Sequence, residues 1–140
     1  MSYFVNANSS DVALAKVGGK AYNLIHIEKS QVNVPSWFVL TTDCFEAFLG
    51  NRLPEYLHIL ENYQDDDRDK ILDLICGIDF SSDLVQQICK EIKSHFSPDD
   101  LLAIRSSAVD EDSKAHSFAG MMESYLEIPA DDTVFECIKK

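Results

Sequence analysis

Apolar residues recur along this chain with two spacings, one near the helical repeat of about 3.6 residues and one near the strand repeat of two. Helical spacing predicts helices over 19–30, 43–49, 55–63, 67–76 and 82–96. Short apolar runs between turn residues predict strands over 37–40, 101–105 and 123–128, and a further short strand at 3–5. Helices and strands in this order predict an α+β fold with a small mixed sheet and several helices.

Residues that favour helix ends support these limits. Thr41, Thr42 and Asp43 are N-cap candidates for the helix over 43–49, and Gly50 follows its last residue. Ser82 is expected to cap the helix over 82–96, whose apolar residues recur every fourth position. Trp37 and Phe38 are interpreted as core residues rather than as a platform on which a ligand ring stacks.

The stretch from Leu101 to Ile128 is the most informative part of the chain. Its first apolar run predicts a buried strand that ends at Arg105, and small residues follow, which let backbone N–H groups approach an anion. In the second strand, alternation predicts residues 125 and 127 on one face and 126 and 128 on the other. An arginine beside serines also occurs as an ordinary strand-end cap, so the residues alone leave both interpretations open.

Lys20 follows a break in the helical pattern at Gly18 and Gly19. We therefore expect Lys20 at or near the start of a helix. A lysine there is unfavourable to the helix dipole, whereas the N–H groups of a helix start together with a lysine suit a phosphate. A solvated surface lysine after a turn fits the same pattern, and both interpretations stay open at this point.

Composition indicates a single domain and limits the partners it can have. The chain has 140 residues, of which 46% are hydrophobic, so it can form a core. Twelve Lys and Arg against 24 Asp and Glu give a net charge of −12, which opposes nonspecific binding to nucleic acid or to an anionic membrane. An anionic ligand must therefore be held by a local site.

Cysteine, histidine and aspartate positions predict no metal centre within the chain. The four cysteines form no CxxC pair, and the histidines His26, His58, His95 and His116 are interpreted as exposed or capping residues. The run 65–67 of three aspartates is interpreted as a solvated helix start, because consecutive side chains point apart round a helix. With dispersed cysteines, no signal peptide and no membrane-spanning run, we expect a soluble cytoplasmic protein.

Two sets of residues carry a resemblance to a known family. One is 105–108 (RSSA), followed by the acidic patch 110–112, then 117–120 (SFAG) and 123–126 (ESYL). The other is 17–20 (VGGK), followed by 34–42 (VPSWFVLTT). In this order they resemble the N-terminal nucleotide-binding domain of the phosphoenolpyruvate synthase and pyruvate phosphate dikinase family, which also includes enzymes of the rifampin phosphotransferase type.

The resemblance implies an ATP-grasp fold and a set of binding residues. Lys20 and Arg105 would contact the phosphates of ATP, and a loop with Ser117, Ala119 and Gly120 would cover them. Family members use Mg²⁺, whose ligands lie in the later half of the domain, so we expect none within this chain. They also relay phosphate through a histidine on a separate domain, so no residue of this chain is expected to be catalytic.

The resemblance therefore implies an ATP-dependent phosphotransferase that is phosphoenolpyruvate synthase-like and passes phosphate to a histidine on another domain and then to pyruvate. Residues 1–140 are expected to form a single incomplete domain of it, inactive by itself. Its expected partners are ATP, a small-molecule acceptor such as pyruvate, and the remaining domains of the parent protein, with no nucleic acid or membrane. Residues 109–112 (VDED) depart from the family pattern, and 121–123 (MME) resemble the dikinase variant. A rifampin phosphotransferase-like enzyme and a noncatalytic nucleotide-binding or interaction module stay open as alternatives.

Overall fold

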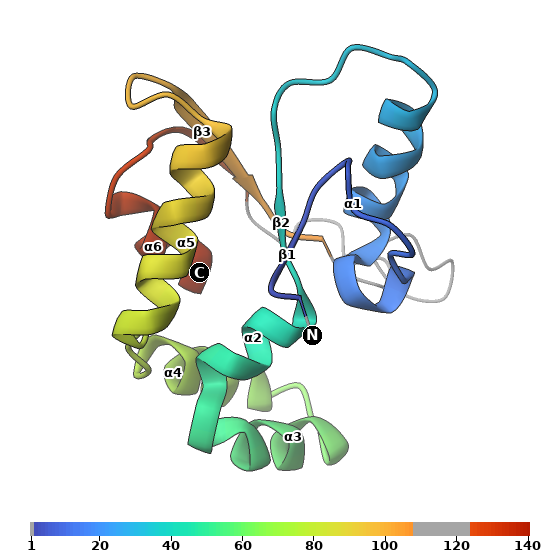
Figure 1. Cartoon of the computed structure of the whole chain (residues 1–140). Coiled ribbons are helices and arrows are strands. Elements are labelled where there is room, and N and C mark those ends of the chain that lie inside the picture. Colours follow the sequence, from blue (N-terminus) through green and yellow to red (C-terminus); the bar gives the residue numbers. More distant parts are fainter. Residues whose placement is uncertain (1, 108–123) are drawn as a thin grey trace.

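The computed structural model describes residues 2–107 and 124–140, and its helices and short strands confirm the α+β class (Figure 1). The strands are β1 (Phe4–Val5), β2 (Val39–Leu40), β3 (Leu101–Arg105) and β4 (Ser124–Pro129). The helices are α1 (Leu14–Lys29), α2 (Thr42–Leu49), α3 (Leu53–Glu61), α4 (Asp67–Cys76), α5 (Ser82–His95) and α6 (Thr133–Lys139), with a 3₁₀ turn at Gly50–Arg52. Within these described ranges, no helix is both long and apolar enough to cross a membrane.

The described strands form two separate antiparallel pairs, β1 with β2 and β3 with β4, so the prediction of one small mixed sheet is wrong. β1 and β2 are two residues long and lie between two apolar clusters. Phe4 and Leu40 pair with each other and pack on the larger cluster, whereas the next pair, Val5 and Val39, packs on the smaller one. Because neighbouring strand residues point to opposite faces, this short pair bridges the two clusters.

The larger cluster forms the main core and the smaller one lies beneath α1. Figure 1 shows α1 on one side of β1 and β2, and α5 and α6 on the other. The buried residues of the larger cluster are Cys44, Phe48, Leu49, Leu74, Leu84, Ile88, Ile92, Leu102 and Val134. Those of the smaller cluster are Val5, Val17, Ala21 and Ile25. Trp37 packs against the smaller cluster and Phe38 against the larger, which confirms the core interpretation of both residues.

The predicted ranges of α2, α3, α4 and α5 agree with the structure to within about two residues at their ends, an offset typical of helix boundaries. α1 begins at Leu14, five residues before the predicted start at 19, because a further helical segment precedes the break at Gly18. Thr41 caps α2 as predicted, because its hydroxyl accepts from the Cys44 N–H at 3.4 Å, and the same hydroxyl donates to the Ser2 carbonyl at 2.7 Å. The cap of α5 was predicted one residue too late. Ser81, in an extended conformation, accepts from the Leu84 N–H at 3.3 Å, and Ser82 is the first helical residue.

The strands differ more from their predictions than the helices do. β2 begins at Val39 rather than at residue 37, because β1 offers only two residues to pair with. Between β3 and β4 a bulge shifts the register, so that residues 102 and 104 pair with 128 and 125. Glu127 has a φ of +56° at this bulge. The predicted alternation over 125–128 is therefore wrong, and Leu126 of β4 is 60% exposed. β3 is not buried on both faces, since Leu101 is 62% exposed.

Asp67 is buried, with 8% of its surface exposed, so the solvated helix start predicted over 65–67 is wrong at this position. Its carboxylate accepts from the Lys70 ammonium at 2.5 Å and from the Gln64 N–H at 2.9 Å. These hydrogen bonds, that of Lys70 first, hold the pKa of Asp67 below its ordinary value. The side chain closes the turn that precedes α4 and does not face solvent.

Candidate functional site

α1 is interrupted at Gly18, and its second half begins at the next residue. Gly18 has φ +78° and ψ 170°, a conformation outside the helical region and open almost only to glycine. Lys20 therefore lies in the first turn of a new helical segment, as the sequence predicted, and it is exposed. At such a start the first N–H groups point away from the helix along its axis.

The space beside Gly18 is filled by Ser107, which follows the end of β3 by two residues. A Cβ atom at position 18 would lie 2.0 Å from the carbonyl oxygen of Ser107 and 2.4 Å from its carbonyl carbon. Both are backbone atoms, which cannot rotate away as a side chain can. Gly18 thus serves close packing between two segments, and the place of its missing side chain is not an open cradle for a ligand.

Ser107 also forms a hydrogen bond to the helix that starts beside it. Its hydroxyl accepts from the Ala21 N–H at 3.1 Å, across 86 positions of sequence. A helix N-cap side chain usually accepts from the N–H two or three residues further on, and Gly18, three residues before Ala21, has no side chain to do so. Ser107 supplies that cap from a distant part of the chain.

β3 brings Arg105 to the same place. Leu102 is buried in the larger cluster and anchors the strand, whereas Arg105 at its end is exposed and pairs with Ser124 of β4. Lys20 and Arg105 each lie two residues from the contact between Gly18 and Ser107, a backbone path of at most about 7 Å on either side. The structure thus brings together the two predicted cations from opposite ends of the chain.

The other site residues predicted from the sequence are not described by the structure. Ser117, Ala119 and Gly120 lie outside the described residues, as does His116. Within residues 2–107 and 124–140, no group of three or more His, Cys, Asp and Glu side chains is arranged to hold a metal ion. The described residues therefore provide positive charge and a helix start for an anion, and by themselves they do not fit a magnesium site.

Trp37 and Glu28 fix the other end of α1. The Trp37 indole N–H donates to the Glu28 carboxylate at 2.5 Å and joins the segment before β2 to the last turns of α1. Lys16, before the break in α1, forms an ion pair with Asp43 in the first turn of α2. α1 is thus held at its start, at its break and near its end, which fixes the direction in which its second half points.

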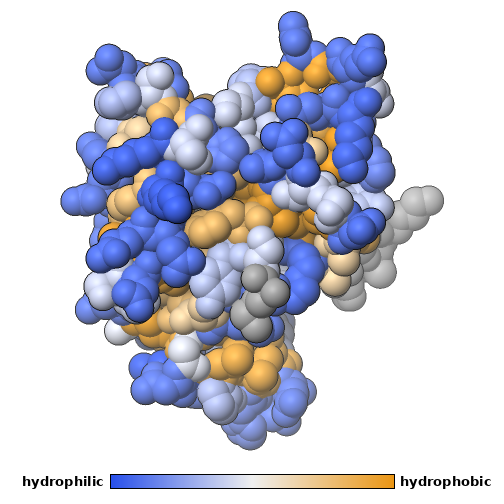
Figure 2. Space-filling model, viewed as in Figure 1, coloured by the Kyte–Doolittle hydropathy of each residue, from blue (hydrophilic) through white to orange (hydrophobic). Residues whose placement is uncertain are grey.

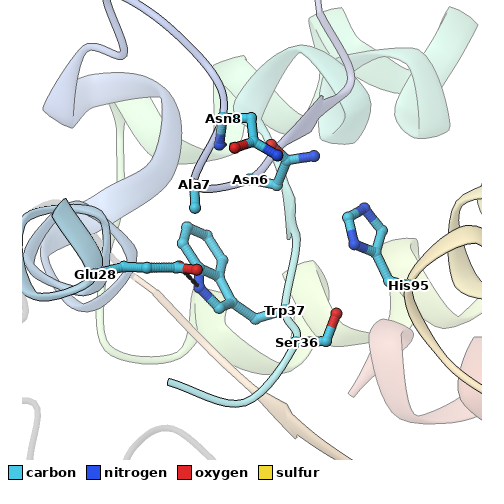
Figure 3. Close-up of a pocket in the computed structure, with 7 residues that line it drawn as sticks. All are labelled: Asn6, Ala7, Asn8, Glu28, Ser36, Trp37 and His95. Carbon is cyan, nitrogen blue, oxygen red and sulfur yellow. Dashed lines mark hydrogen bonds between the residues drawn. The ribbon is translucent and has the colours of Figure 1, made fainter. Parts of the chain in front are cut away.

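A small cavity lies between α1 and α5, where the outline of the molecule is indented (Figure 2). It has a volume of about 120 Å³. Figure 3 shows the hydrogen-bonded Glu28 and Trp37 on one side and His95 on the other. Its lining residues are Asn6, Ala7, Asn8, Glu28, Ser36, Trp37 and His95. Neither Lys20 nor Arg105 lines this cavity, although Ser36 and Trp37 of the stretch 34–42 do, so it is distinct from the place where the two cations meet.

His95 departs from the interpretation of the histidines as exposed or capping residues. Its ring is partly buried, stacks on Phe38 with ring centroids 5.3 Å apart, and lies 3.0 Å from a carboxylate oxygen of Glu91. His26 and His58 are exposed, as predicted. His95 contacts Phe38 and Phe96, which pack against the larger cluster, and these aromatic contacts explain its partial burial.

Ser107 is the residue whose role the sequence did not reveal. In the sequence it is one of several small residues that follow Arg105. The signal that could have found it is indirect: the helix after Gly18 has a glycine at the position where a capping Ser, Thr or Asp usually stands. A helix start without a local cap indicates that a distant side chain, solvent or a ligand satisfies its N–H groups.

Comparison of the sequence with known proteins identifies a family. Residues 14–140 match the family described as pyruvate phosphate dikinase, AMP/ATP-binding domain. Prodigiosin synthesizing transferase PigC of Serratia marcescens is 34% identical over 120 residues, which cover 85% of this chain. Rifampicin phosphotransferase of Bacillus subtilis is 33% identical over 137 residues, or 91% of this chain. A probable phosphoenolpyruvate synthase of Methanothermobacter thermautotrophicus is 28% identical, and the match covers 100% of this chain.

The matched part of each relative is small. The chain spans 13%, 16% and 22% of the length of these three proteins, respectively. The resemblance inferred from the two motifs is confirmed by the family match, which includes both of them.

Proposed function

The chain belongs to the pyruvate phosphate dikinase family of AMP/ATP-binding domains, and on that premise we propose that Lys20 and Arg105 bind the phosphates of ATP. The observation that carries this proposal is the contact of Gly18 with Ser107, which brings the lysine motif and the arginine motif together. The net charge of −12 also supports the proposal, because a chain of this charge can bind a polyanion only where its cations are gathered locally.

The two cations have different tasks in this proposal. The planar Arg105 guanidinium can donate two parallel hydrogen bonds to two oxygens of one phosphate. Lys20 supplies a compact charge at a helix start, whose dipole also favours an anion. Together they would neutralise and orient the phosphates, and Ser117, Ala119 and Gly120 would cover them.

We further propose that residues 1–140 are the first part of an ATP-grasp-type domain within a longer phosphotransferase. The small share of each relative that the chain spans supports this interpretation. Magnesium ions, when bound, would offset the negative charge of the phosphates. As the family resemblance implies, we place the ligands of these ions outside residues 1–140. The role of this chain is then to bind and orient ATP.

The phosphate acceptor has two candidates. A phosphoenolpyruvate synthase-like protein would pass phosphate to a histidine on another domain and then to pyruvate. A rifampicin phosphotransferase-like protein would pass it to the antibiotic, and the rifampicin phosphotransferase of Bacillus subtilis is 33% identical to this chain. Incubating the parent protein with ATP and either pyruvate or rifampicin, and identifying the phosphorylated product, separates them.

Equilibrium binding of ATP tests the central proposal. We expect Lys20→Ala and Arg105→Ala each to weaken binding by about tenfold to a hundredfold, since a charge-assisted hydrogen bond contributes about 1.5 to 3 kcal/mol. Arg105→Lys should recover only part of the affinity, because lysine keeps the charge and loses the second hydrogen bond. Binding is measured with magnesium chloride present.

Arg68→Ala and Lys93→Ala are the matched controls. Each removes one exposed positive charge, from α4 or α5, and so changes the net charge by the same amount. We expect both controls to bind ATP as the unchanged chain does. If they lose as much affinity as Lys20→Ala and Arg105→Ala, the effect is one of net charge, and the proposed site is wrong.

A further inference from the structure

Hydroxyl groups cap α2, α5 and the second half of α1, and the cap of α1 differs from the others in its origin. Thr41 and Ser81 stand immediately before their helices and accept from the N–H three residues further on. Ser107 makes the equivalent hydrogen bond to Ala21 from 86 positions away. A local cap is enough to stabilise a helix start, so the distant one has a further consequence.

The distant cap places the lysine motif, at the start of the second half of α1, against the arginine motif at the end of β3. A serine at position 18 could not replace Ser107, because its Cβ would stand 2.0 Å from the Ser107 carbonyl oxygen. The hydroxyl of Ser107 and the closeness of Gly18 therefore fix the start of the helix against the segment that follows β3. Ala21 strengthens the link, since its side chain is buried in the smaller cluster with Val17 and Ile25.

We propose that Ser107 is the positioning residue of the phosphate site, and that its hydrogen bond to Ala21 holds Lys20 at a set distance from Arg105. This inference rests on the proposed function of the two cations. Ser107 itself does not contact the phosphates in this account. Ser107 acts on Lys20 because Lys20 directly precedes Ala21, whose N–H donates to the Ser107 hydroxyl. It acts on Arg105 because Arg105, the last residue of β3, lies two residues before Ser107.

The test compares Ser107→Ala with Ser81→Ala, which also removes a serine cap from a helix start. Hydrogen exchange of the Ala21 amide should become faster in Ser107→Ala and stay unchanged in Ser81→Ala. ATP affinity should fall about tenfold in Ser107→Ala, the scale of a lost cap, and stay unchanged in Ser81→Ala. Ser107→Thr keeps the hydroxyl and should recover most of the affinity.

A double-mutant cycle separates positioning from direct phosphate contact. If Ser107 acts through Lys20, then Ser107→Ala should cost much less ATP affinity in a Lys20→Ala background than in the unchanged chain. An equal cost in both backgrounds, an unchanged Ala21 amide, equal affinities of Ser107→Ala and Ser81→Ala, or no recovery in Ser107→Thr would overturn the inference. Absence of ATP binding by the unchanged chain would instead overturn the proposed function, and this role with it.

Discussion

Adding one methyl group at Gly18 should destabilise the protein far more than the same change at another glycine of positive φ. Gly18 and Gly50 have φ values of +78° and +52°, so alanine strains the backbone at either position by about 1 to 3 kcal/mol. At Gly50 no atom lies within 4 Å of the added Cβ. At Gly18 the Cβ would overlap the backbone of Ser107, and overpacking of this kind adds about 1 to 3 kcal/mol.

Gly18→Ala should therefore lose about 1 to 3 kcal/mol more stability than Gly50→Ala. At roughly 3 °C per kcal/mol for a chain of this size, the melting temperatures of the two variants should differ by about 3 to 9 °C. Thermal and urea unfolding followed by circular dichroism measure both quantities. Equal losses in the two variants would refute the contact between Gly18 and Ser107, and with it the link between the two motifs.

Three further measurements test the fold. Burial raises the pKa of Cys44 to about 11, so a thiol reagent at about pH 8 should modify the exposed Cys76 first and Cys44 only as the protein unfolds. The pKa of Asp67 is lowered in the folded protein, so its carboxylate stabilises the fold above the unfolded pKa of about 3.9, and this contribution is lost as pH falls through the native pKa. Urea unfolding should therefore find Asp67→Asn less stable than the unchanged chain at about pH 7. The difference in stability should shrink below about pH 4. Leu102→Ala should cost about 2 to 5 kcal/mol and Leu126→Ala less than about 0.5 kcal/mol, since only the former is buried, and similar losses would contradict the register of β3 with β4.

The helices were predictable because their signals are local. The apolar spacing of α5 and the turn chemistry around Thr41 and Gly50 act within a few residues, and the structure agrees with them. The strands were less predictable, because pairing depends on a partner elsewhere in the chain. No periodicity signals the bulge at Glu127, which exposes Leu126 and brings residues 125 and 128 to the same face.

In the candidate site, too, the local features could be predicted from the sequence and the long-range contacts could not. Lys20 at a helix start and Arg105 at a strand end could be placed from their own neighbours in sequence. Their closeness could not, because it depends on the packing of Gly18 against Ser107, and the cap at Ala21 spans 86 positions. A glycine in place of a cap is a weak signal by itself, and only the fold shows which hydroxyl replaces it.

An NMR titration of the isotopically labelled chain with ATP and magnesium chloride tests most directly whether two distant motifs form one phosphate site. The account predicts that the amide signals of residues 18–21 and of residues 104–107 shift together, with one shared dissociation constant. Amides around the cavity lined by Glu28, Trp37 and His95 should keep their positions. Shifts confined to one of the two motifs, or centred on that cavity, would contradict the account.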